Sequence, residues 1–82
     1  MSAHRLSGSV VAVLGASGAL GSRIARGASE RGAHVVLVGR DAARLESVVE
    51  GAVVVVGDIA DAGLGDRVVA AATERHGGLD GL

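Results

Sequence analysis

A glycine-rich segment between an apolar run and a helical pattern constrains this 82-residue chain more than any other feature. The segment is Gly15–Gly21 (GASGALG), and Ser9–Leu14 (SVVAVL) precedes it. The β-branched run is typical of a buried parallel strand, and the pattern from Leu20 to about Arg31 predicts an amphipathic helix. Glycines at a strand-to-helix turn let the backbone bend tightly and let a ligand and the helix approach closely. The segment therefore predicts a βαβ unit whose turn is a binding loop.

The remaining sequence repeats the alternation of strand and helix. The predicted strands are rich in valine, and the predicted helices end at glycines. After the first helix we expect a strand at His34–Val38, a helix at Ala42–Glu50, a strand at Ala52–Val56, a helix from about Leu64 to His76, and the opening of a fourth strand at Leu79–Leu82. The order β-α-β-α-β-α-(β) predicts an α/β fold with a partial, doubly wound, three-stranded parallel sheet.

Helical spacing predicts which side chains are buried. Leu20, Ile24, Ala25 and Ala28 fall on one face of the first helix, and we expect that face to lie against the sheet. Asp41 precedes the second helix as its expected N-cap. Because the chain has no Phe, Tyr or Trp, aliphatic side chains must supply the whole core.

Composition excludes several classes of function. The net charge of −1 does not favour nucleic acid or membrane partners, and the apolar run Val10–Leu14 is far shorter than the ~20 residues of a membrane span. There is no Cys, and His4, His34 and His76 are too scattered to form a metal site. We therefore expect a soluble, cytoplasmic protein without a metal.

The binding loop predicts a phosphorylated ligand. The amino end of a helix after such a loop presents free N–H groups and the positive end of the helix dipole to phosphates, which is the arrangement of dinucleotide sites. Six arginines against two acidic residues in positions 1–45 fit this ligand. The loop residues expected to bind the dinucleotide are Gly15, Ser17, Gly18, Ala19, Leu20 and Gly21.

Two further strand ends favour a particular dinucleotide. An acidic residue after the second strand would bind the ribose 2′-hydroxyl of NAD, but this chain has Arg40 there, which favours the 2′-phosphate of NADP over NAD. Arg44, one helical turn later, is a candidate helper; alternatively, Arg40 only caps a turn. After the third strand, Asp58 and Ile59 are the remaining candidates, with Asp58 either accepting from the adenine amino group or only capping its loop.

Together these segments resemble the short-chain dehydrogenase/reductase family. The matching stretches are VVAVLGASGALG, HVVLVGRDAARLE, VVVVGDIAD and the closing GGLDGL. The loop glycines fall at the first, fourth and seventh positions, as in the extended and divergent members, rather than at the common first, fifth and seventh. The resemblance implies the N-terminal half of an NAD(P)-binding Rossmann domain, truncated at residue 82.

The family's catalytic residues have no counterpart in this sequence. Members use a Tyr-x-x-x-Lys pair with a Ser and an Asn for proton transfer, and this chain has no Tyr, Lys or Asn. Its eight basic residues are all Arg, whose pKa is too high for acid–base work. We therefore expect the binding portion of an NADP-preferring oxidoreductase; the alternatives are a non-catalytic dinucleotide-binding or interaction module and a fragment without function.

The predicted strand order also implies an unpaired edge. In a doubly wound sheet the first strand is central and pairs with the fourth, of which only Leu79–Leu82 is expected here. An unpaired apolar strand edge recruits partners. We therefore expect the exposed edge of the first strand to cause non-specific self-association or poor folding; the alternative is a specific dimer, with two copies related by a two-fold axis parallel to that strand.

The first prediction concerns activity. The purified 82-residue chain should show no dehydrogenase activity, because it lacks the Tyr, Lys and Asn that move the proton. Absorbance of the reduced cofactor, followed with a panel of alcohols and ketones, tests this. Cofactor-dependent turnover of any one of them by the chain alone would contradict it.

Overall fold

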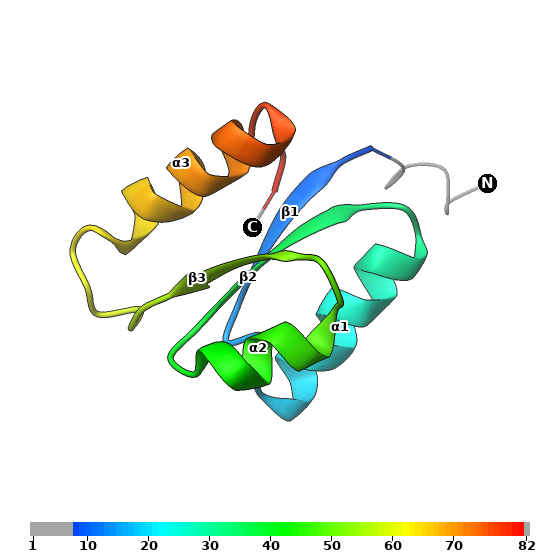
Figure 1. The fold of residues 1–82 in the computed structure, drawn as a ribbon, viewed down its shortest axis with the longest axis horizontal. Helices are drawn as coiled ribbons and strands as arrows, with labels where there is room; N and C mark the ends of the chain where they lie inside the picture. The colour runs from blue at the N-terminus through cyan, green and yellow to red at the C-terminus, as the bar shows by residue number, and fades with distance from the viewer. Residues whose placement is uncertain (1–7, 82) are drawn as a thin grey trace.

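The computed structural model describes residues 8–81 and consists of three strands that alternate with three helices (Figure 1). The elements are β1 (Val10–Leu14), α1 (Ala19–Glu30), β2 (His34–Gly39), α2 (Ala42–Val48), β3 (Val53–Val56) and α3 (Leu64–His76). The strands form one parallel sheet in the order β1-β2-β3. The predicted fold class, a partial doubly wound α/β sheet, is confirmed.

The sheet lies between two helical layers, with α3 on one face and α1 and α2 on the other (Figure 1). Side chains of each strand alternate between the two faces, as the pleat requires. Toward α3 the strands present Val10, Ala12, Val36, Val38 and Val55; toward α1 and α2 they present Val13, Val35 and Leu37. Both faces are apolar, which explains the nearly continuous valine runs in the sequence.

Of the fourth strand expected to open at Leu79–Leu82, Gly81 lies next to β1, and Leu82 is outside the described residues. Gly81 forms a parallel bridge with Val11, Ala12 N–H donates to the Gly81 carbonyl (3.0 Å), and Gly81 N–H donates to the Val10 carbonyl (3.2 Å). The Asp80 carboxylate also accepts from Val10 N–H (2.7 Å). The free edge of β1 is therefore shorter than the sequence predicts, because residues 80 and 81 cover its amino-terminal part.

The predicted buried face of α1 is wrong in two of its four residues. Ala25 is fully buried and Ala28 partly so, but Leu20 and Ile24 are 72% and 52% exposed. The cause lies at Gly21, where an added Cβ would overlap the Gly15 carbonyl group. Since the helix lies this close to the strand, the small residues contact the sheet and the large ones are displaced to its flank.

The second and third helices are capped by the predicted residues, and the bounds of several elements differ from the prediction by one or two residues. Asp41 accepts from Arg44 N–H (3.2 Å) and caps α2, and Gly77 ends α3 in the left-handed conformation at φ +84°. The second helix ends at Val48 rather than Glu50, because Val49 is already extended. Within residues 8–81, no helix combines the length and the apolarity that crossing a membrane needs.

The contact between α1 and β1 gives a stability prediction. Gly21→Ala should destabilise the fold by about 1–3 kcal/mol, because the new methyl group would collide with backbone that cannot move aside cheaply. Gly27→Ala, in the same helix, is the matched control, because an added Cβ there meets nothing within 4 Å. It should stabilise by about 0.5–1 kcal/mol. Denaturant unfolding with the same sign for both variants would contradict the prediction.

Two histidines stack at the edge of the sheet opposite the glycine loop. The rings of His34, at the start of β2, and His76, at the end of α3, lie with centroids 4.4 Å apart and planes 20° from parallel. Partial burial lowers the pKa of His76 below its ordinary 6.5, and positive charge on His34 and on Arg75 lowers it further. The native state therefore disfavours the protonated form of His76.

This pKa shift gives the fold a defined response to pH. A base with a lowered native pKa binds its proton more readily when unfolded, so its share of the stability is complete above about pH 6.5 and is lost as the pH falls toward the native pKa. The melting temperature of the chain should thus decrease between neutral and mildly acid pH. His76→Gln should reduce that decrease, and an identical pH profile for the variant would refute the assignment.

Candidate functional site

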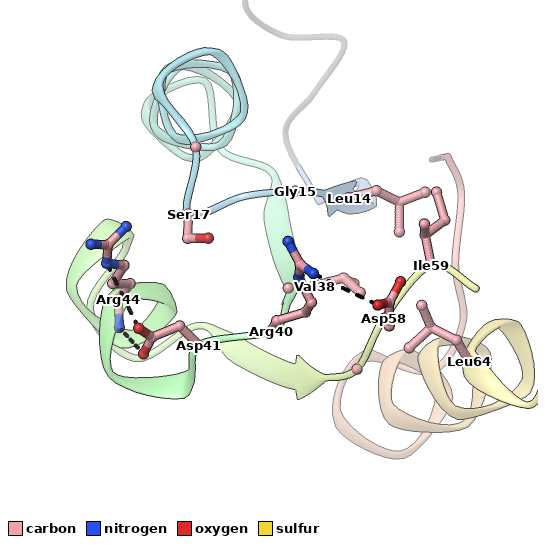
Figure 2. Close-up of a pocket in the computed structure, with 13 residues that line it drawn as sticks. Leu14, Gly15, Ser17, Val38, Arg40, Asp41, Arg44, Asp58, Ile59 and Leu64 are labelled. Atoms are coloured by element: carbon pink, nitrogen blue, oxygen red, sulfur yellow. Dashed lines mark hydrogen bonds and ion pairs between the residues drawn. The ribbon is translucent and has the colours of Figure 1, made fainter. Parts of the chain in front are cut away.

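The loops that follow the three strands meet at one edge of the sheet. Because the strands are parallel, their carboxyl ends all lie at this edge, where ligands of open α/β sheets bind. A cleft of about 670 Å³ opens there (Figure 2). It is lined by the loop after β1 (Leu14, Gly15, Ser17 and Gly18), by the residues after β2 (Gly39, Arg40, Asp41 and Arg44) and by the loop after β3 (Gly57, Asp58 and Ile59).

The glycine loop forms the wall of the cleft nearest α1. Gly15 has φ +67°, a left-handed conformation that side chains rarely adopt, and it turns the chain out of β1. Gly18 N–H donates to the Gly15 carbonyl (3.0 Å), and Ala16 N–H donates to the Val38 carbonyl (3.1 Å). These bonds hold the loop across the end of β2, so its path is fixed by backbone contacts rather than by side chains.

The amino end of α1 opens from this loop without a capping side chain. Gly18 is the N-cap residue and makes no side-chain hydrogen bond, and the first turn holds no acidic residue. The first N–H groups of a helix have no partner within it and carry the positive end of the dipole. This end of α1 is therefore suited to bind an anion.

Arginines from the end of β2 and from α2 form the basic side of the cleft. Arg40 Nη1 lies 3.8 Å from Asp58 Oδ2, and Arg44 Nε lies 3.7 Å from Asp41 Oδ2. Figure 2 shows Arg40 directed toward Asp58, with Arg44 and Asp41 together on the other side of the cleft. The arginine side chains are 81% and 75% exposed. Exposed ion pairs of this kind contribute about 0–1 kcal/mol, so both guanidinium groups remain available to a phosphate.

Asp58 has one carboxylate oxygen engaged in its own loop. Oδ1 accepts from Ala60 N–H (3.0 Å), which is the capping role considered from the sequence, while Oδ2 faces Arg40. The loop is closed further by Asp58 N–H, which donates to Asp61 Oδ2 (3.1 Å). The carboxylate is thus held at the wall of the cleft. Contact between Asp58 and adenine stays a prediction.

The structure brings most of the predicted binding residues to the cleft. Gly15, Ser17, Gly18, Arg40, Asp58 and Ile59 line it, whereas Ala19, Leu20 and Gly21 do not. Leu20 lies on the exposed flank of α1, and Gly21 acts through helix–strand contact. Leu14, Val38 and Leu64 form an apolar wall of the cleft that the sequence interpretation did not include. The available signal was the position of these residues, which lie at or near the ends of strands and helices beside the binding motifs.

No group of three or more His, Cys, Asp or Glu side chains lies close enough to hold an ion within residues 8–81. The two stacked histidines are at the opposite edge of the sheet from the cleft. The cleft combines the uncapped amino end of α1 and two arginines with acidic side chains and an apolar wall.

Solved structures of dehydrogenases share this architecture. A protein from Pseudomonas syringae described as a short chain dehydrogenase matches 96% of the chain at 30% identity, with a TM-score of 0.83. The glucose dehydrogenase of Caenorhabditis elegans matches 93% at 27% identity, also with a TM-score of 0.83. L-sorbose reductase from Gluconobacter frateurii, solved with NADPH and L-sorbose, matches 90% at 35% identity, with a TM-score of 0.79.

These likenesses cover only part of each relative. The chain spans 37%, 36% and 31% of those three proteins, respectively. No curated protein sequence matches the chain. The sequence model of the short chain dehydrogenase family, however, matches residues 9–82, which is nearly the whole chain. The glycine loop, the parallel sheet and this match together place the chain in the short chain dehydrogenase family.

Proposed function

We propose that the cleft binds NADP and that the chain is the dinucleotide-binding portion of an oxidoreductase that transfers hydride between NADP and an alcohol or ketone. The observation that carries the proposal is the uncapped amino end of α1, which opens from the glycine loop into the same cleft as Arg40. An anion site and a guanidinium group at opposite sides of one cleft suit a ligand with separated phosphates.

The loop glycines fit the pyrophosphate of such a ligand. Gly18 has an ordinary φ of −78°, and a Cβ there would lie 3.4 Å from the Gly15 carbonyl oxygen, an acceptable contact. Packing within the chain therefore does not require glycine at this position. The missing side chain leaves the backbone of the loop open toward the cleft, where a phosphate group needs close approach.

Arg40 and Arg44 fit the 2′-phosphate that distinguishes NADP from NAD. Arg40 follows β2 directly, and Arg44 lies in the first turn of α2, so both arginines line the cleft. The planar fork of Arg can bond two phosphate oxygens at once. L-sorbose reductase, which was solved with NADPH, supports this choice of cofactor through its 35% identity to the chain.

Bound NADP would supply the hydride chemistry, and the residues of this chain would bind and orient it. The amino end of α1 holds the pyrophosphate, Arg40 holds the 2′-phosphate, and Asp58 with Ile59 forms the side of the cleft for adenine.

Replacing Arg40 tests the cofactor assignment. Arg40→Ala should weaken NADPH binding roughly 10- to 150-fold and leave NADH binding unchanged, because a charge-assisted hydrogen bond of about 1.5–3 kcal/mol is lost. Isothermal titration calorimetry with both cofactors gives the two affinities. Arg23→Ala, which removes the same charge from an exposed site on α1 away from the cleft, is the matched control and should change neither affinity.

Two results would count against the proposal. Equal affinities of the unmodified chain for NADH and NADPH would exclude the 2′-phosphate contact of Arg40. The absence of binding to either cofactor, in a chain that melts cooperatively, would exclude the dinucleotide site itself.

A further inference from the structure

The loop after β3 carries the adenine side of the cleft but has no regular structure of its own. It connects β3 to α3 and places Asp58 and Ile59 at the cleft. Its internal hydrogen bonds join Asp58 to Ala60 and Asp61. Gly57 N–H donates to the Gly39 carbonyl (2.8 Å), which ties the start of the loop to β2. Beyond Gly57 the internal bonds shape the loop locally, and a contact from α3 joins this part of the loop to the end of β3.

Arg67, from the first turn of α3, makes that contact. Its Nη1 donates to the Val56 carbonyl at the end of β3 (2.9 Å), and its Nη2 lies 3.6 Å from Asp61 Oδ2. The same Asp61 oxygen accepts from Asp58 N–H (3.1 Å). One guanidinium group therefore joins the last residue of the strand, the helix and the carboxylate that holds the backbone of Asp58.

The sequence leaves space for this guanidinium at Gly57. A Cβ at Gly57 would lie 2.5 Å from Arg67 Nη2 and 2.8 Å from Leu64 Cδ1, although the backbone of Gly57 has no left-handed conformation to explain the glycine. A side chain at Gly57 would therefore displace the guanidinium of Arg67 or the methyl group of Leu64 from its present position. Lys could not replace Arg67 fully, because a single ammonium group lacks the planar fork that serves two acceptors in fixed directions.

We propose that Arg67 is the positioning residue of the adenine side of the cleft: through Asp61 it sets the direction in which Asp58 meets the base. This inference rests on the proposed function, because the proposed function identifies the ligand as an adenine dinucleotide. The Arg67–Asp61 pair is half exposed, so its contribution to global stability is small. Its effect is on the orientation of the loop, and it therefore shows in loop dynamics and in base recognition.

The first measurement needs no ligand. Arg67→Gln should accelerate hydrogen exchange of the Asp58 and Ala60 amides about 10-fold or more, because their hydrogen bonds open with the loop, while the amides of β1 keep their protection. Asp61→Asn removes the negative charge but keeps one side-chain oxygen that can accept from Asp58 N–H. It should therefore have the same effect to a smaller degree. Arg75→Gln is the matched control, because Arg75 also reaches a backbone carbonyl from α3, that of Gly51 (3.5 Å), at the other end of the helix.

The second measurement reports on the base. Arg67→Gln should bring the affinity ratio of NADP⁺ to its deaminated analogue, in which hypoxanthine replaces adenine, toward one, since a misdirected Asp58 no longer distinguishes the amino group. The preference for NADPH over NADH, which depends on Arg40, should persist. A role of Arg67 in stability alone would lower the melting temperature without changing this ratio.

The outcomes separate this inference from the proposed function. Unchanged exchange at Asp58 and Ala60 in Arg67→Gln would overturn the positioning role, whether or not a nucleotide binds. Accelerated exchange with an unmodified chain that binds no dinucleotide would overturn the proposed function and restrict Arg67 to holding the loop. Accelerated exchange together with the lost base discrimination would support both.

Discussion

The contact between the backbones of α1 and β1 sets the geometry on which the cleft depends. At Gly21 the helix lies so close to the Gly15 carbonyl that no side chain fits between them. This approach directs the amino end of α1 to the carboxyl end of the strand and requires the left-handed turn at Gly15. Ala25, one turn further along, is fully buried against the same sheet. The position of the uncapped amino end of α1 at the strand ends is thus a direct consequence of the contact between the two glycines.

The cleft has a positively charged side and a negatively charged side, and a ligand can change the interaction between them. The residues after β2 supply positive charge through Arg40, and the loop after β3 supplies negative charge through Asp58. Their separation of 3.8 Å and their exposure make the pair weak, so a phosphate can displace Asp58 from Arg40 at little cost. The carboxylate would then be left with its bond to Ala60 N–H and with one oxygen free for a donor.

The strands and the glycine loop could be predicted because local sequence determines them. Runs of valine without polar interruption specify strands buried on both faces, and glycine is required wherever the chain turns left-handed. The exposure of Leu20 and Ile24 could not be predicted in this way, because helical periodicity identifies an apolar face but not the distance between helix and sheet. That distance depends on Gly21, whose role becomes clear only when β1 is placed beside it.

The part of the site that the sequence did not reveal involves residues far apart along the chain. Arg67 lies in a pattern typical of a solvent-exposed helical arginine, and only the fold brings it to the carbonyl of Val56. The ion pair between Asp58 and Arg40 could not be predicted for the same reason: the spacing between Asp58 and Ala60 permits a cap, but nothing local places Arg40 opposite Asp58. The spacing of residues within a motif predicts the local backbone conformation. The ionic contacts across the cleft can be predicted only when the arrangement of the strands in the sheet is known.

Sheet order explains why the cleft lies where these contacts converge. The chain moves outward from β1 to β2 to β3 and then returns through α3, so that residue 81 pairs with β1 on the side away from β2. Right-handed crossovers in opposite directions put α3 on the opposite face of the sheet from α1 and α2. The cleft lies at the carboxyl ends of the parallel strands, where ligands of open α/β sheets bind, and the residues after β1, β2 and β3 line it. The amino end of α1 lies at the same edge of the sheet, so the uncapped N–H groups of the helix and the open cleft occur together.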